Sequence, residues 1–192
     1  DKRRARINMI AHLLSTLPYG ETEPAPIKLP HRPAPTGYQR PGKTTLERTL
    51  PWLRAQGDKP FFLFFHLYEP HAPYSPPEPY KSRYPLAYDG EIALADEVVG
   101  QLLTELKSLG VYDEALIVLT SDHGDALGDH DEVGHGVFVY RSTMQVPLLV
   151  KLPGNVRAGS NVSALAQLAD IAPTLLAAAW LEPAPELAGR DL

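Results

Sequence analysis

The chain is organised around the stretch ALIVLTSDHGDALGDHDEVGHG, which runs from Ala115 to Gly136. Residues 115–120 are an apolar run rich in β-branched side chains, which predicts a buried strand. Asp122 and His123 come directly after that strand. Open α/β sheets bind their ligands at the carboxyl ends of their strands, so this pair stands where a ligand site is expected.

A carboxylate oxygen beside an imidazole nitrogen suits a divalent cation of borderline hardness. The alternative interpretation of Asp122 and His123 is a polar, solvated loop. The preceding strand and the downstream Gly134-His135-Gly136 favour the metal site. The other acidic residues lack the spacing of a calcium loop and are expected to be solvated; they are Asp125, Asp129, Asp131 and Glu132.

Bulk composition excludes several classes of protein. A chain of 192 residues with 44% hydrophobic content can bury one sizeable core. A net charge of −5 argues against a nucleic-acid or anionic-membrane partner. Cysteine is absent, which excludes disulfides and thiolate metal ligands, and no apolar run is long enough to predict a transmembrane helix. The sequence leaves the cellular compartment open.

The chain divides into two parts. Residues 1–42 are predicted to be a proline-rich N-terminal segment or connection, with an amphipathic helix over 1–17 and extended chain over 18–42. Residues 43–192 carry regular hydrophobic patterns. Their order of strand, helix and strand predicts a βαβ unit in a parallel or mixed sheet. We expect helices near 44–56, 89–109 and 165–180, and strands near 61–67, 115–120 and 146–152.

Two further histidines lie at the end of the strand predicted over 61–67, which reads as buried on both faces. His66 is either a residue that supports the site ligands or a buried, hydrogen-bonded side chain, and the pattern favours the second. His71 begins a loop over 70–87 that is rich in proline and tyrosine. That loop is either a rigid surface connection or a substrate-lining loop that positions His71.

Several ordered motifs resemble the second half of a sulfatase of the alkaline-phosphatase superfamily. The resemblance covers roughly residues 43–192. It implies an α/β, alkaline-phosphatase-like fold with a mixed or parallel central sheet flanked by helices, present here as a partial domain. The matching stretches are Phe61 to Tyr74, Tyr88 to Ile92, Ser121 to Gly124, Gly134 to Gly136, Val146 to Val150 and Asp170 to Leu175.

The resemblance also implies roles for individual residues. Asp122 and His123 look like ligands of a divalent metal ion: Ca²⁺, Mn²⁺ or Zn²⁺. His71 looks like the histidine near the sulfate ester, where it could give a hydrogen bond or a proton to the leaving-group oxygen. His135 takes the place where related enzymes carry a lysine or histidine that contacts the anion.

The sequence departs from the family in one important respect. Working sulfatases also need a pair of aspartates near the N-terminus and a Cys- or Ser-x-Pro-Ser-Arg motif, whose first residue becomes the nucleophile formylglycine. Neither feature occurs among the 192 residues. Residues 43–192 are therefore expected to be the C-terminal portion of a catalytic domain whose N-terminal half is missing, and the isolated chain is expected to be inactive.

Three functions stay open at this stage. The first is metal-dependent hydrolysis of sulfuric esters by the parent protein. The second is phosphoryl transfer by a phosphodiesterase, phosphonate-ester hydrolase or phosphoglycerol transferase of the same superfamily. The third is a non-catalytic binding domain. The pair Asp122-His123 replaces the aspartate-asparagine of many arylsulfatases, and its extra nitrogen ligand favours Mn²⁺ or Zn²⁺ over Ca²⁺. Neither the substrate nor the metal follows from the sequence.

Overall fold

A four-stranded mixed sheet forms the centre of the computed structural model, which describes residues 9–12 and 40–192. The strand order is β2-β1-β3-β6; β1 is parallel to β2 and to β3, whereas β6 is antiparallel to β3. This confirms the predicted mixed α/β sheet. The strands are β1 (Met9–His12), β2 (Phe62–Phe64), β3 (Ile117–Thr120) and β6 (Leu148–Lys151).

The strand β1 corrects the helix predicted over residues 1–17. Ala11 is in register with Phe64 on one side and with Val118 on the other, so β1 lies inside the sheet. Its hydrogen bonds to two parallel neighbours stabilise the extended chain and override the helical periodicity of the surrounding apolar residues. The rest of 1–39 lies outside the described residues, and the division at residue 42 stays a prediction.

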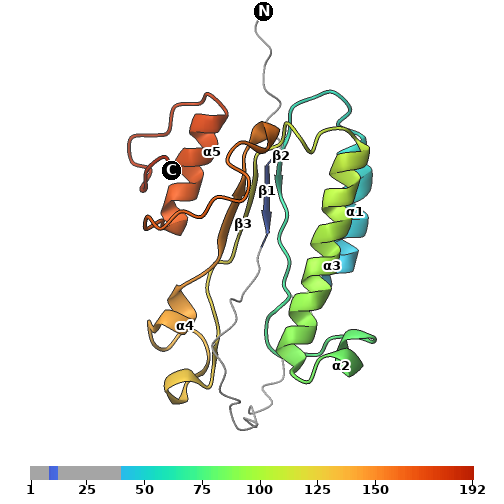
Figure 1. Cartoon of the computed structure of the whole chain (residues 1–192), viewed down its shortest axis with the longest axis vertical. Coiled ribbons are helices and arrows are strands. Elements are labelled where there is room, and N and C mark those ends of the chain that lie inside the picture. The colour runs from blue at the N-terminus through green and yellow to red at the C-terminus, as the bar shows by residue number, and fades with distance from the viewer. Residues whose placement is uncertain (1–8, 13–39) are drawn as a thin grey trace, which may run out of the picture.

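Two long helices cover one face of the sheet. Helices α1 (Gly42–Arg54) and α3 (Ala87–Ser108) run side by side along the strands, and the short α2 (Tyr80–Arg83) contacts α3 near its start (Figure 1). The helices predicted near 44–56 and 89–109 are thus confirmed. The core between these helices and the sheet includes Leu46, Leu53, Leu63, Phe65, Val98, Leu102 and Leu106.

The two faces of β2 differ in burial. Phe61, Leu63 and Phe65 are buried, whereas Phe62 and Phe64 are 59% and 63% exposed. The prediction that this strand is buried on both faces is therefore wrong in the part of the chain that the structure describes. Alternate side chains of a strand point to opposite faces, and α1 and α3 cover only one of them.

His66 follows the same alternation. It is exposed and stacks on Phe64, with 6.3 Å between the ring centroids. The prediction that His66 is buried is therefore wrong. The cause is that residues 65 and 66, just beyond β2, continue its alternation, which puts His66 on the same uncovered face as Phe62 and Phe64.

The remaining elements surround the carboxyl end of β3 and the far side of β6. The helix predicted over 165–180 is shorter, because the buried Asp170 accepts hydrogen bonds from the backbone N–H groups of Gln167 and Arg190 and fixes a tight turn before it. These elements are β4 (Ala126–Leu127), β5 (Val133–Gly134), α4 (Arg141–Met144) and α5 (Ile171–Ala178), with 3₁₀ turns η1 (Asp129–Asp131), η2 (Pro153–Asn155) and η3 (Leu168–Asp170).

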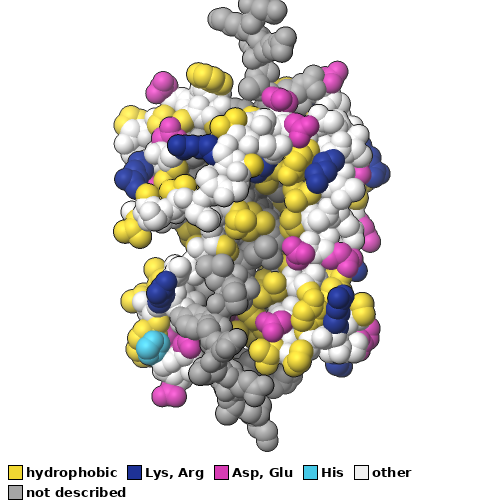
Figure 2. Space-filling view, in the orientation of Figure 1, with side chains coloured by type: hydrophobic (Ala, Val, Ile, Leu, Met, Phe, Trp, Pro, Cys, Tyr) yellow, Lys and Arg dark blue, Asp and Glu magenta, His cyan; other side chains and the backbone are white. Residues whose placement is uncertain are grey.

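Charged side chains of both signs are interspersed over the face shown in Figure 2. This distribution agrees with the modest net charge of −5 and gives no broad basic surface among the described residues on that face. None of the described helices combines the length and the hydropathy that crossing a bilayer requires.

Candidate functional site

Three histidines from separate loops converge beyond the carboxyl ends of β2 and β3. His71 follows β2, His123 follows β3, and His135 follows β5 of the small hairpin. One ring nitrogen from each lies within 4.8 Å of the others. The rings of His123 and His135 stack with 3.8 Å between centroids, and those of His71 and His135 lie 5.2 Å apart. Because β2 and β3 are both parallel to β1, their carboxyl ends meet at one edge of the sheet.

The three imidazole rings share one hydrogen-bonding pattern. In each ring Nδ1 faces an oxygen that can only accept, so Nδ1 carries the hydrogen and a neutral ring keeps its lone pair on Nε2. The acceptors for His71, His123 and His135 are, in that order, the Ala72 carbonyl at 2.7 Å, the Gly124 carbonyl at 2.9 Å and the Asp125 carboxylate at 3.0 Å.

Asp122 completes the group of residues singled out from the sequence. Its Oδ1 lies 3.6 Å from Nε2 of His123 and accepts a hydrogen bond from the backbone N–H of His123 at 3.0 Å. The Asp122 side chain is 61% exposed. Asp122, His123 and His71 line a cavity of about 170 Å³. The structure thus brings Asp122, His123, His71 and His135 together, and their chemical roles stay predictions.

Asp125 is a site residue that sequence reasoning missed. Its side chain is only 5% exposed, and its carboxylate accepts hydrogen bonds from the Tyr74 hydroxyl and from Nδ1 of His135. Burial, followed by the bond to Asp125, raises the pKa of Tyr74 and keeps that hydroxyl a donor. The expectation of a solvated loop acid is wrong here because the partner Tyr74 lies 51 residues away in the sequence.

Of the other acidic residues in this loop, two are exposed and one is buried. Asp129 and Asp131 are exposed, as expected. Glu132 is buried and accepts a hydrogen bond from the backbone N–H of Phe138 at 3.1 Å, so the expectation of a solvated side chain is wrong for it. Glu132 therefore stabilises the chain that follows His135.

Close packing fixes the backbone beside His123. The N–H of Gly124 donates to the Thr143 carbonyl in α4 at 2.8 Å. A Cβ on Gly124 would lie 2.1 Å from the Ser142 carbonyl oxygen, far closer than any side chain tolerates. Only glycine fits at this position, and its contact with α4 holds the adjacent His123 in place.

The loop over 70–87 is anchored on both sides of His71. The ring of Tyr68 lies 4.5 Å from that of His71, and the backbone N–H of Ser75 donates to the buried Glu91 of α3 at 2.9 Å. Desolvation raises the pKa of Glu91. Tyr68, Pro70 and His71 line the same cavity as Asp122, which favours the interpretation of this loop as a lining of the site.

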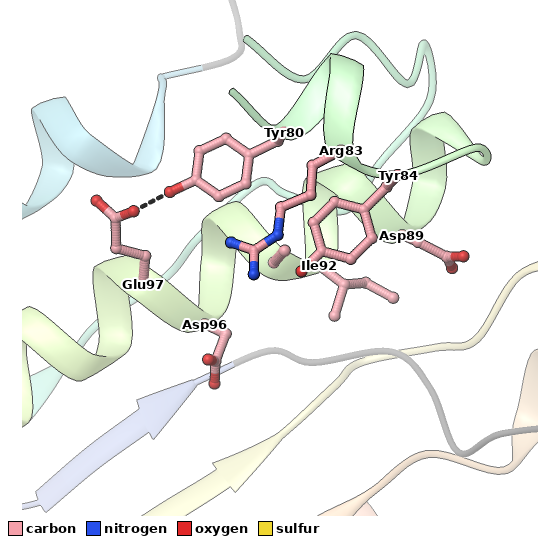
Figure 3. A pocket seen from close by; sticks show the side chains of 8 residues that line it. Tyr80, Arg83, Tyr84, Asp89, Ile92, Asp96 and Glu97 are labelled. Atoms are coloured by element: carbon pink, nitrogen blue, oxygen red, sulfur yellow. Dashed lines mark hydrogen bonds between the residues drawn. The ribbon is translucent and has the colours of Figure 1, made fainter. Parts of the chain in front are cut away.

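A larger cavity of about 570 Å³ lies between α2 and α3. In Figure 3 its side chains come from these two helices and from Tyr84, which directly follows α2, and Tyr80 donates a hydrogen bond to Glu97. None of the histidines lines it. We therefore place the functional site at the smaller cavity, where the groups that can bind a metal or move a proton converge.

Comparison with known proteins indicates one family for the chain. The model of the sulfatase family matches residues 18–180. An N-acetylglucosamine-6-O-sulfatase of Bacteroides thetaiotaomicron is 35% identical over 105 residues, covering 55% of this chain and 19% of that protein. A steryl-sulfatase of Rattus norvegicus is 31% identical over 173 residues, covering 82% of this chain and 30% of that protein.

Solved structures give the same result for the fold. A phosphonate monoester hydrolase of Agrobacterium radiobacter superposes with a TM-score of 0.73 at 26% identity, covering 79% of this chain and 41% of that one. The α/β, alkaline-phosphatase-like fold is thereby confirmed. The chain spans less than half the length of each of these relatives.

Proposed function

Since the chain belongs to the sulfatase family, we propose that the full-length protein containing it is a metal-dependent sulfuric ester hydrolase. The observation that carries this proposal is the meeting of Asp122, His123, His71 and His135 at the carboxyl edge of the sheet. In this proposal the chain supplies part of the metal site and part of the anion site.

Asp122 and His123 suit the metal ion by their chemistry and spacing. Two ligand atoms bound to one ion at about 2.1 Å lie roughly 3.0–3.4 Å from each other. The 3.6 Å between Oδ1 of Asp122 and Nε2 of His123 needs only a small adjustment to reach that range. Sulfatases generally use a divalent ion, which supplies positive charge for the ester oxygens. Oxygen and nitrogen together suit Ca²⁺, Mn²⁺ or Zn²⁺, with the nitrogen favouring the last two.

His71 is proposed to serve the leaving group. Its Nδ1–H is occupied by the Ala72 carbonyl, so Nε2 is the nitrogen free to exchange a proton in the cavity. A protonated Nε2 can donate to the oxygen that departs when the sulfur–oxygen bond breaks.

His135 is proposed to bind the anion. Asp125 fixes the orientation of its ring through Nδ1, and Tyr74 fixes Asp125. A protonated Nε2 of His135 would then donate to a sulfate oxygen without reorienting, which is the condition for strong transition-state stabilisation.

The nucleophile is proposed to come from outside these residues. Sulfatases use formylglycine, and the motif that carries it does not occur in the 192-residue sequence. We propose that the N-terminal half of the same protein supplies formylglycine and the paired aspartates. On this view the isolated chain does not turn over sulfate esters.

A second candidate function is hydrolysis of phosphonate or phosphate esters. The similarity to a phosphonate monoester hydrolase favours it. Tetrahedral phosphorus and sulfur esters present similar oxygens to Asp122, His123, His71 and His135, so the nucleophile and its surroundings must discriminate between them.

The test compares two substrates with the same leaving group. The full-length protein is assayed on p-nitrophenyl sulfate and on p-nitrophenyl phenylphosphonate, with metal content measured on the same sample. The proposal expects the higher kcat/KM for the sulfate ester. A higher value for the phosphonate would favour the second candidate. A metal-loaded protein that cleaves neither would favour a binding domain.

A further inference from the structure

We propose that His71, His123 and His135 form a three-nitrogen site that binds Zn²⁺ in this chain and does not need the carboxylate of Asp122. The site differs from the pair Asp122-His123, because two of its three ligands are the residues assigned above to the leaving group and the anion. It requires no catalytic activity and no residue outside the chain.

The first support for the zinc site is the spacing of the ring nitrogens. One nitrogen from each of the three rings lies within 4.8 Å of the other two. In a tetrahedral zinc site with Zn–N bonds of about 2.0–2.1 Å, ligand nitrogens are roughly 3.3 Å apart. Side-chain rotation can close the difference, because His123 and His135 are partly exposed.

The second support for the zinc site is the hydrogen bonding of the three rings. A histidine that binds a metal through one nitrogen almost always donates its other N–H to a carboxylate, a backbone carbonyl or water. All three rings already do so through Nδ1, two to carbonyls and one to Asp125. The acceptors therefore leave the Nε2 lone pair of each ring available to bind an ion. Asp125 is itself held by Tyr74, which extends this support one residue further.

The choice of ion follows from the donors. Three neutral imidazoles favour zinc and neighbouring transition metals, whereas Ca²⁺ and Mg²⁺ favour oxygen ligands. His123 has a single lone pair on Nε2, so it can serve the three-histidine site or the pair with Asp122, but not both at once. If the proposed function holds, zinc at the three histidines also removes His71 and His135 from their roles and inhibits hydrolysis.

The test measures zinc affinity in the 192-residue chain by competition with a chromophoric chelator at pH 7.5. His71→Ala and His135→Ala should each weaken binding at least about tenfold, because loss of an outer-shell partner alone already costs about 10–100-fold. The matched control is His130→Ala, because His130 is exposed, stacks on Tyr140 at 4.1 Å and lies outside the cluster. It should stay within about twofold of the unchanged chain.

Three outcomes would overturn the inference. Unchanged zinc affinity in both His71→Ala and His135→Ala would place any bound zinc elsewhere. Loss of affinity in Asp122→Ala alone would place it on the Asp122-His123 pair, which leaves the proposed function intact. A measurement on the unchanged chain guards against misfolded variants: zinc should shift the imidazole ¹⁵N resonances of Nε2 in His71, His123 and His135 together, with smaller changes at Nδ1. Nε2 signals of these rings that stay in place at saturating zinc would likewise contradict the site.

Discussion

The packed side of the sheet and the loop-built site differ in what holds them together. Leu102 of α3 is fully buried among apolar side chains of α1, α3 and the sheet. Asp122, His123, His71 and His135 all lie on loops after strands and are at least partly exposed. The three histidines are held by hydrogen bonds to backbone carbonyls or to Asp125, and Asp122 accepts one from the backbone N–H of His123. Apolar burial therefore stabilises one side, and directed polar contacts hold the candidate site residues in place on the other. Substitutions should separate the two.

The largest effect is expected from His71→Ala in the full-length protein. Loss of a positioned acid or base should lower turnover about 10²–10⁴-fold. The melting temperature should change little, because His71 lies outside the apolar core. Steady-state kinetics and thermal melting on the same sample check both expectations. Metal content, measured with the enzyme's working ion, should stay near normal. Equal loss of metal and turnover would show that His71 is a ligand of that ion and not a separate acid or base.

On the packed side, Leu102→Ala should lower the free energy of unfolding by about 2–5 kcal/mol, because it leaves a cavity among residues that cannot fully collapse into it. The matched control is Leu165→Ala, since Leu165 is 88% exposed. Its change should stay within roughly 0.5 kcal/mol. Urea unfolding of the 192-residue chain gives both values. Similar losses in the two variants would contradict the assignment of stability to this core.

Asp125→Asn tests how a buried side chain affects the candidate site, because the buried carboxylate of Asp125 orients the His135 ring. The amide can offer a hydrogen to Nδ1 of His135 and so favour the other tautomer. We expect a fall of about 10–100-fold in kcat/KM, the usual scale for a residue that orients a site residue. The ¹⁵N shifts of His135 should report the change of tautomer. The control Asp129→Asn, at an exposed acid in the same loop, should change neither quantity.

The smallest effect is expected at the C-terminal turn, away from both regions. Hydrogen bonds from the backbone N–H groups of Gln167 and Arg190 lower the pKa of Asp170 below its ordinary value. Its contribution to stability is therefore fully present above the ordinary carboxyl pKa of about 4 and is lost as pH falls through the lowered value. Hydrogen exchange of the amides near 167–190 should accelerate relative to α3 as pH is lowered through that range. The same pH dependence in Asp170→Asn would rule out this carboxylate as its source.

The sequence predicted which candidate residues meet better than it predicted the side chains that hold them. Asp122, His123 and His71 could be found because each follows a recognisable strand, and parallel strands bring their carboxyl ends together. Asp125 could not, because nothing distinguishes it from Asp129 along the chain. Its burial depends on Tyr74, which folding brings from a loop far away in the sequence.

The same limit applies to the sheet. Phe61 to Phe65 read as a strand from composition alone, but which alternate residues are covered depends on where α1 and α3 pack. The strand Met9–His12 was missed because four residues carry little local preference and gain their extended form from two partner strands. Tertiary contacts, rather than local propensity, determine the covered face of residues 61–65 and the extended form of Met9–His12.

The central claim is that the loops after β2 and β3 form the metal and anion side of an ester-hydrolysing site. The most direct measurement is the release of sulfate from an aryl sulfate ester by the full-length protein, with bound metal counted in the same sample, for the unchanged protein and for Asp122→Ala. The account predicts that the variant loses most of its metal and about 10²-fold or more of its turnover, while the control His130→Ala keeps both. Full metal content and full turnover in Asp122→Ala would contradict it.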